Sequence, residues 1–272
     1  MLSESRRSRF VRLNALRSAT WPKLPDQQAL NSSLETVSAV PGVYRVLKPS
    51  LALSHMLVEG ILQFQDLASY CAVLAADPRA NERVLDICGA PGVKTSAIAQ
   101  FMRNSGSIIS VDSSASRLKS WEAQTTRMGV KIATPVLADA TNLPMTGEQD
   151  LILLDPPCSG TGILDQNPRM KLNLNHSVIR SYSVLEARML EEASRLVSSG
   201  GRIVYSTCSI TTEENEDVVS NFLKSHPDME TKPVGLPPGL GEPGMRGLTD
   251  CRRFFPDSDE SAGYFIARLE HS

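Results

Sequence analysis

Two cysteines of this 272-residue chain stand at positions where a thiol could do chemistry. Cys158 follows Asp155 and two prolines, directly after the apolar run LILL at 151–154. Cys208 follows the apolar run GRIVY at 201–205 and lies in the short polar segment STCS. Runs of this kind are typical of strands buried in a sheet, so we expect each thiol just past the carboxyl end of a strand.

The segment between these two runs contains a helical pattern, which predicts a strand–helix–strand unit. Such units join parallel strands, and the carboxyl ends of parallel strands meet at the edge of the sheet where ligands bind. We therefore expect Cys158 and Cys208 to lie in one cleft. A free cysteine is more often a small buried hydrophobic side chain, and we assign Cys71 and Cys251 to that ordinary class.

A pair of thiols beside a carboxyl group suits methylation of carbon 5 in a pyrimidine ring, because that carbon is not itself nucleophilic. A thiolate can add to carbon 6 and so raise the electron density at carbon 5. The attacking sulfur must be deprotonated, which requires surroundings that favour the charged form. A base then removes the proton from carbon 5, and a carboxyl group such as Asp155 can stabilise charge at the ring nitrogen edge.

A second motif, VLDICGAPG at 84–92, joins an earlier predicted strand to a helix. Its small residues allow backbone N–H groups to approach a ligand closely. The segment is not the GxGxxG pattern of dinucleotide-binding folds, because Pro91 and other residues occupy the glycine positions. Asp86, just before the loop, suits a ligand that carries an ammonium group. Without further signals, an ordinary strand-to-helix turn would be the better interpretation.

Two more acids follow the next predicted strands. Asp112 ends one of them, where a carboxylate can accept hydrogen bonds from both hydroxyl groups of a ribose. Asp139 lies past the third strand, where it could accept a bond from an adenine amino group. Each acid alone is more often a helix cap or a loop residue. Together with Asp86 they indicate an adenosyl ligand, and S-adenosylmethionine is the cofactor that we expect.

The elements that must position these residues alternate between strand and helix from about residue 61. Strands are predicted at 83–87, 107–111, 131–137, 151–154, 201–205 and 263–269. Helices are predicted at 94–102, 116–128, 177–198 and 213–224, the third with Val178, Tyr182, Leu185 and Met189 on one face. This alternation predicts an α/β fold, a mostly parallel sheet flanked by helices, over 61–272. Residues 1–60 predict a small, partly irregular N-terminal subdomain.

Charge and composition restrict the classes of protein that need to be considered. The formal net charge is -2, but residues 1–50 hold eight Lys and Arg against three acids. A basic N-terminal region on an acidic body can meet a polyanion, although a solvated N-terminus explains the charge about as well. No run approaches the roughly 20 apolar residues of a membrane span, and no CxxC pair suggests a metal site. We expect a cytoplasmic monomer that binds neither membrane nor metal.

At this point the sequence resembles the Sun/Fmu family of RNA 5-methylcytosine methyltransferases. The motifs that carry the resemblance follow in family order: VLDICGAPGVKT (84–95), VDSSASRL (111–118), the Asp139 segment, DPPCSGTG (155–162) and YSTCS (205–209). Flanking segments match as well: FVRLNALR (10–17), FQDLAS (64–69) and GMRGLTDCRRFFP to GYFIARL (244–269). The resemblance therefore covers most of the chain, and the paired PCSG and TCS motifs are highly specific to this family. It implies a class I, Rossmann-like methyltransferase fold.

By this resemblance Cys208 is the nucleophile, Cys158 assists product release, and Asp155 contacts the cytosine. The cofactor would be held by Cys88, Gly89, Ala90, Pro91, Gly92, Lys94, Asp112, Arg117, Asp139 and Asp155. The substrate would be RNA, transfer RNA slightly favoured over ribosomal RNA, and the N-terminal subdomain would contact it. Phosphate contacts are conceivable at Lys131, Arg169, Lys171 and Arg180, although solvated surface is the more common role for such residues.

Two departures from the family pattern leave alternatives open. Val93 replaces the usual second glycine of the cofactor loop, and Pro156 replaces the commoner alanine. The resulting DPPC is similar to the [DN]PP[FY] motif of amino-group methyltransferases, but it has a thiol where those enzymes have an aromatic ring. A DNA cytosine-5 methyltransferase would use Cys158 as nucleophile. A non-catalytic RNA-binding or ribosome-assembly factor could retain the fold, and a nicotinamide-dependent dehydrogenase is disfavoured by the GAPG loop.

Overall fold

The computed structural model describes residues 8–18, 30–166, 172–256 and 260–271. Its main sheet has the strand order β11-β12-β13-β9-β8-β5-β6-β7, and β10 pairs with β13. The five parallel strands are β5 (Arg83–Ile87), β6 (Ser107–Asp112), β7 (Ala133–Leu137), β8 (Gln149–Leu154) and β9 (Val197–Thr207). The remaining, antiparallel strands are β10 (Met229–Lys232), β11 (Glu242–Pro243), β12 (Arg252–Phe254) and β13 (Tyr264–His271). The predicted mostly parallel sheet is confirmed.

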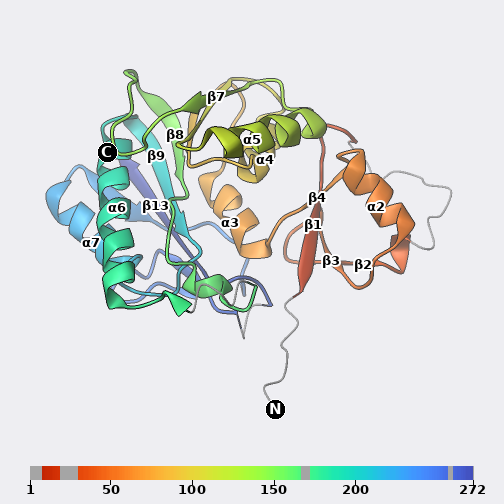
Figure 1. Cartoon of the computed structure of the whole chain (residues 1–272). Coiled ribbons are helices and arrows are strands. Elements are labelled where there is room, and N and C mark those ends of the chain that lie inside the picture. The colour runs from red at the N-terminus through yellow and green to blue at the C-terminus, as the bar shows by residue number, and fades with distance from the viewer. Residues whose placement is uncertain (1–7, 19–29, 167–171, 257–259, 272) are drawn as a thin grey trace, which may run out of the picture.

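Helices cover both faces of this sheet, which is why its strands are apolar at successive positions. Along β8, Leu151 and Leu153 pack on one face with α3 (Leu67–Ala76) and α4 (Val93–Phe101). Ile152 and Leu154 pack on the other face with α6 (His176–Ser194) and α7 (Glu216–Ser225). Figure 1 shows α6 and α7 on one side of the sheet and α3 and α4 on the other, with α5 (Ala115–Met128) beside α4. In the part of the chain that the structure describes, no helix is long and apolar enough for a membrane span.

The end of α6 differs from the prediction. The expected helix over 177–198 stops at Ser194, and residues from Val197 belong to the 11-residue strand β9. Gly200, with a φ of +73°, is a poor helix former, and the pairing of β8 with β9 shifts register there. The inner face also differs in part, because the fully buried positions of α6 include Glu186 as well as Met189. The other three residues expected on that face are only half-buried: Val178, Tyr182 and Leu185.

The N-terminal region forms a four-stranded antiparallel sheet, more regular than its sequence suggests. The order is β2-β3-β1-β4, with the strands β1 (Arg9–Leu13), β2 (Leu34–Thr36), β3 (Val43–Val46) and β4 (Leu62–Phe64). Helix α2 (Leu51–Val58) packs on it, and Val11, Leu53, Met56 and Leu62 form a small separate core. Figure 1 shows this sheet standing beside the main one. Strand β4 lies beyond residue 60 and pairs with β1.

A buried arginine ties this sheet to the larger one. Arg12 in β1 is 1% exposed, and burial lowers its pKa to about 10. Its guanidinium donates to Gln65 Oε1 at 2.8 Å, to Gln100 Oε1 at 2.7 Å and to Ser96 Oγ at 2.7 Å, the last two on α4. Asn14 adds bonds to the carbonyls of Gly60 and Met128. The charge of Arg12 is thus used inside the protein and does not face an RNA.

Candidate active site

The candidate site lies where four neighbouring parallel strands end. The order β9-β8-β5-β6 places Thr207, Leu154, Ile87 and Asp112 along one edge of the sheet. The loops that follow β5, β8 and β9 carry the motifs singled out from the sequence. The expectation that these motifs converge at the carboxyl ends of the strands is confirmed.

The loop after β5 is closely packed against its neighbours. A side chain at Gly89 would overlap Ser110 Oγ and the carboxylate of Asp86, so only glycine fits. Gly92 has a φ of +93° and caps α4, which begins at Val93, one residue earlier than expected. The valine in place of the family's second glycine is therefore accommodated as the first residue of the helix.

Asp86 is completely buried behind this loop. Its Oδ2 accepts a bond from Thr95 Oγ1, which in turn accepts one from Trp121 Nε1 at 3.0 Å. Its Oδ1 has no hydrogen-bond partner among the described residues. Burial raises the pKa of Asp86 to about 6. A buried carboxylate oxygen without a donor is costly, and a cationic group bound at this loop would supply the donor.

Asp112 and Arg117 connect the ends of β5 and β6. Asp112 is 1% exposed, and its Oδ1 accepts from the Ser114 N–H at 3.0 Å. Its Oδ2 lies 3.0 Å from Arg117 Nη1, and Arg117 also donates to the carbonyl of Ala90 in the cofactor loop. Arg117 thereby holds the loop after β5 against the end of β6.

Asp139 is exposed at the carboxyl end of β7. Its Oδ1 accepts from the backbone N–H of Thr141 at 2.9 Å and from the Thr141 hydroxyl at 2.8 Å, and these bonds lower its pKa. It therefore remains a charged acceptor at neutral pH.

The two thiols predicted to share a cleft are in contact. The Sγ atoms of Cys158 and Cys208 are 3.0 Å apart, and both side chains are half-buried. The hydrogen bond to Cys208, together with burial, raises the pKa of Cys158 well above its ordinary value. Cys158 therefore stays a neutral thiol that can donate its proton to the Cys208 sulfur.

Asp155 is held beside the thiols by three donors. Lys94 Nζ lies 2.6 Å from Asp155 Oδ2, while Tyr264 OH and Ser206 Oγ donate to Oδ1 at 2.8 and 3.1 Å. Lys94 Nζ also lies 5.5 Å from the centre of the Tyr264 ring. Burial on its own would lower the pKa of Lys94, but the charge of Asp155 raises it above the ordinary value. Lys94 and Asp155 are therefore a fixed ion pair at the cleft.

Ser206 and Tyr264 are functional neighbours that sequence reasoning missed. Tyr264 reaches Asp155 because β13 pairs with β9, although the two residues are 109 positions apart in the chain. Its segment gave only the signal of a strand, so nothing local indicated a role for its hydroxyl group.

The other three cysteines have different surroundings. Cys71 and Cys251 are completely buried in the hydrophobic core, as predicted for ordinary structural thiols. Cys88 lies in the cofactor loop with a φ of +64°, and burial raises its pKa to about 12. A thiol so hard to ionise is a poor nucleophile.

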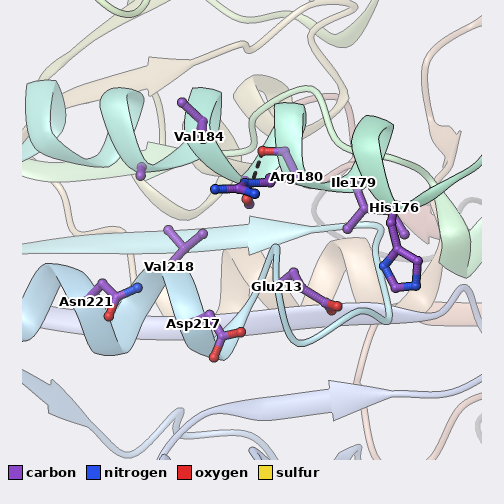
Figure 2. A pocket seen from close by; sticks show the side chains of 10 residues that line it. His176, Ile179, Arg180, Val184, Glu213, Asp217, Val218 and Asn221 are labelled. Atoms are coloured by element: carbon purple, nitrogen blue, oxygen red, sulfur yellow. Dashed lines mark hydrogen bonds between the residues drawn. The ribbon is translucent and has the colours of Figure 1, made fainter.

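Two of the four surface cations considered as phosphate contacts lie in the described part of the chain. Lys131 and Arg180 are exposed, and Arg169 and Lys171 lie outside the described residues, as do Arg6, Arg7 and Lys23 of the basic N-terminal region. Arg180 lines a groove of about 510 Å³, which has α6 on one side and α7 with Glu213 just before it on the other. Figure 2 shows Arg180 and Val184 on one wall of this groove and Glu213 and Asp217 on the other. None of the residues predicted to bind cofactor or to react lines it.

Comparisons with known proteins show what this chain is similar to. The family model described as 16S rRNA methyltransferase RsmB/F matches residues 73–270. A probable ribosomal RNA small subunit methyltransferase B from Bacillus subtilis is 32% identical over 95% of this chain and 59% of its own length. A tRNA (cytosine(72)-C(5))-methyltransferase from Pyrococcus horikoshii is 32% identical over 81% of this chain and 55% of its own length. The chain thus spans little more than half the length of these curated relatives.

A solved structure shares the fold over almost the whole chain. The crystal structure of a methyltransferase homolog protein from Pyrococcus horikoshii superposes with a TM-score of 0.83 at 29% identity. The superposition covers 97% of this chain and 87% of that one, so it includes the small N-terminal sheet as well as the main sheet. The Rossmann-like methyltransferase fold expected from the sequence is confirmed.

Proposed function

The chain belongs to the RsmB/F family of methyltransferases, and from this premise we propose that it transfers a methyl group from S-adenosylmethionine to carbon 5 of a cytosine in RNA. Membership confirms the resemblance to the Sun/Fmu family. The observation that carries the proposed chemistry is the contact of two thiols, 3.0 Å apart, beside a carboxylate that is held by three donors.

The described residues fit the cofactor. Asp86 offers a buried, unpartnered carboxylate oxygen that suits an ammonium group, and the glycine at position 89 leaves the loop backbone accessible. Asp112 and Asp139 are acceptors at two further strand ends, suited to ribose and adenine. When bound, S-adenosylmethionine supplies an electrophilic methyl group on its sulfonium. Besides Asp86, the proposed contact set is Cys88, Gly89, Ala90, Pro91, Gly92, Lys94, Asp112, Arg117, Asp139 and Asp155.

In the proposed mechanism, Cys208 forms a bond to carbon 6 of the cytosine, and carbon 5 becomes nucleophilic. Asp155, fixed by Lys94 and Tyr264, meets the ring nitrogen edge and accepts a hydrogen bond from the amino group of the cytosine, and the adjacent Lys94 ammonium offsets the negative charge that builds on the ring. After methyl transfer a base removes the proton from carbon 5 and the bond between carbon 6 and sulfur breaks. The neutral Cys158 thiol lies against the departing sulfur and stabilises it by a hydrogen bond, which assists release.

The proposal names the substrate first as a class, RNA, and then as a kind of RNA. RNA as the substrate class follows from the names of the relatives, which include a ribosomal and a transfer RNA enzyme at the same 32% identity. Sequence reasoning slightly favours transfer RNA, and the trapped RNA described below decides between the two. A cytoplasmic monomer completes the proposal, with the N-terminal region, which β4 extends from the expected 1–60 to Phe64, in contact with RNA and the rest of the chain as the methyltransferase domain.

The proposal is tested by trapping the covalent intermediate. The Cys158→Ala variant is mixed with total cellular RNA and S-adenosylmethionine, and the products are separated on a denaturing protein gel. We expect a slowly migrating RNA adduct, because attack by Cys208 proceeds while release stalls. The adduct should vanish in the Cys158→Ala, Cys208→Ala double variant, and sequencing the trapped RNA identifies the substrate.

Two other outcomes would change the assignment. An adduct that accumulates in Cys208→Ala instead would reverse the thiol roles, as in a DNA-type enzyme. If the protein binds the cofactor but no variant forms an adduct, covalent catalysis is contradicted. The result would then favour the alternative of a non-catalytic RNA-binding factor.

A further inference from the structure

The residues that directly follow the two reactive cysteines converge on one buried glutamate. Ser159 donates to Glu214 twice, from its N–H to Oε1 at 2.6 Å and from its hydroxyl to Oε2 at 2.6 Å. The hydroxyl groups of Ser209 and Thr211 donate to Oε2 at 2.7 and 2.8 Å. Glu214 therefore joins the loop that carries Cys158 to the loop that carries Cys208.

The position of Glu214 is itself fixed by its neighbours. Glu214 is completely buried, and its carbonyl accepts a bond from Tyr205 OH at 2.5 Å. The adjacent Asn215 accepts from Thr207 Oγ1 at 2.6 Å and donates to the carbonyl of Ser209 at 3.0 Å. The carboxylate is thus anchored to β9 and to the loop after it, and it reaches across to the loop after β8.

A second buried acid stands nearby but has a different electrostatic character. Glu186 on α6 is completely buried, and burial together with the charge of Glu214 raises its pKa to about 10. It is therefore neutral at physiological pH and adds no second negative charge behind the thiols. Glu213 provides a matched control for Glu214, since it is the preceding glutamate and its carboxylate lines the groove beside α6 instead of joining the two cysteine loops.

We propose that Glu214 is a positioning residue whose carboxylate sets the separation of the Cys158 and Cys208 sulfur atoms. The consequence for catalysis rests on the proposed function, but the positioning itself does not. Other links join the same loops, from Gly162 N–H to the Cys208 carbonyl at 2.9 Å and between the Thr161 and Ser209 hydroxyls at 2.9 Å. Removing the carboxylate should therefore loosen the thiol pair without unfolding the protein.

The positioning is tested without RNA or cofactor by disulfide trapping. Diamide accepts two electrons and two protons while Cys158 and Cys208 form an S–S bond, which requires their sulfur atoms to close from 3.0 Å to about 2.05 Å. The rate is followed by alkylation and peptide mass spectrometry. We expect Glu214→Gln to slow this disulfide by about tenfold, because an amide places a donor where donors already converge. Glu213→Gln should trap at the wild-type rate.

The result that overturns the proposal is a folded Glu214→Gln variant, checked by circular dichroism, that traps at the wild-type rate. If this variant does not fold, the Ser159→Ala, Ser209→Ala variant removes two of the four donors with little change of volume. It should also slow trapping, and wild-type trapping in this variant would equally contradict the proposal.

A catalytic readout separates positioning from general damage. In the RNA adduct assay, Glu214→Gln should accumulate adduct, because displacement of Cys158 slows release more than attack by Cys208. Equal loss of adduct formation and decay would indicate general damage and contradict a positioning role. Failure of the proposed function gives a different pattern, namely no adduct in any variant while the difference in disulfide trapping persists.

Discussion

At the scale of single residues, the chemistry of the cleft depends on hydroxyl groups as much as on the thiols. Asp155 receives two of its three donors from Ser206 and Tyr264. Hydrogen bonds to a charged carboxylate are stronger than those between neutral groups, and they also fix its direction. The orientation of the Asp155 carboxylate is therefore set by β9 and β13 together with Lys94.

Replacing Tyr264 with phenylalanine removes one donor and leaves the ring against Lys94. We expect kcat/KM for methyl transfer to fall by about tenfold, since a lost bond to a charged group is worth roughly 1.5 kcal/mol. The affinity for S-adenosylmethionine, measured by calorimetry, should change little. The control is Tyr182→Phe on α6, and equal activity of the two variants would exclude a role for the Tyr264 hydroxyl.

Glu186 makes the stability of the protein depend on pH. Its folded pKa of about 10 exceeds the ordinary value of 4.5, so the folded state holds a proton that the unfolded state releases. The contribution is fully present below pH 4.5 and is lost as the pH rises toward 10, at up to roughly 1.4 kcal/mol per pH unit. Glu186→Gln should remove this loss, so the stability that the variant gains over the wild type in urea unfolding should be about 3 kcal/mol larger at pH 8 than at pH 6. The exposed Glu122→Gln serves as control, and equal gains at both pH values would contradict a neutral Glu186.

At the scale of elements, the loop after β5 packs so closely against Ser110 and Asp86 that it leaves no room for a side chain at Gly89. Gly89→Ala places a methyl group against Ser110 and Asp86, so we expect a loss of about 1–3 kcal/mol of stability and weaker cofactor binding. Gly235→Ala, with no atom near the added methyl group, should leave both unchanged. Thermal unfolding measures the loss of stability, and calorimetry measures the affinity for the cofactor. A Gly89→Ala variant that binds the cofactor as tightly as the wild type would contradict the close packing of this loop.

The strands and helices around the site could be predicted because their periodicity is local. Strand β5 matches the predicted 83–87, and α4 and α5 each begin within one residue of the prediction. The end of α6 could not be predicted in the same way, since 195–198 suit a helix until the pairing of β9 with β8 competes for them. The N-terminal sheet was missed as a regular structure because its strands of three to five residues pair across long intervals.

The candidate site likewise contains residues that local sequence predicts and residues that only long-range contacts bring into place. Cys158, Cys208, Asp112 and Lys94 stand in motifs whose composition is itself unusual, so sequence reasoning could place them. Glu214 could not be placed, because its partners come from two loops and nothing in the sequence distinguishes it from a helix-start acid. Contacts made across the sheet leave no local pattern.

At the scale of the whole molecule, the two sheets are joined by a polar contact inside a hydrophobic interface. Phe10 and Val43 of the small sheet pack into the same core as α4, and Arg12 crosses that boundary. A buried cation in such a place stabilises the interface only while all its acceptors are in position.

Replacing Arg12 with methionine leaves Gln65, Ser96 and Gln100 without their shared donor. We expect a loss of about 3 kcal/mol or more in the free energy of unfolding, measured in urea. Arg9→Met, which removes an exposed guanidinium stacked over Phe64, should cost well under 1 kcal/mol. A small effect of Arg12→Met would show that the apolar contacts alone hold the two sheets together.

The bonds from Arg12 reach the first and second turns of α4, whose N-terminus is the cofactor loop. Arg12 and helix α4 therefore connect the small sheet to the cofactor loop. A ligand that changes the affinity of the cofactor by acting on this sheet must have its own affinity changed by the cofactor by the same factor. The Arg12 bonds are the contact through which such coupling would pass between the small sheet and the cofactor loop.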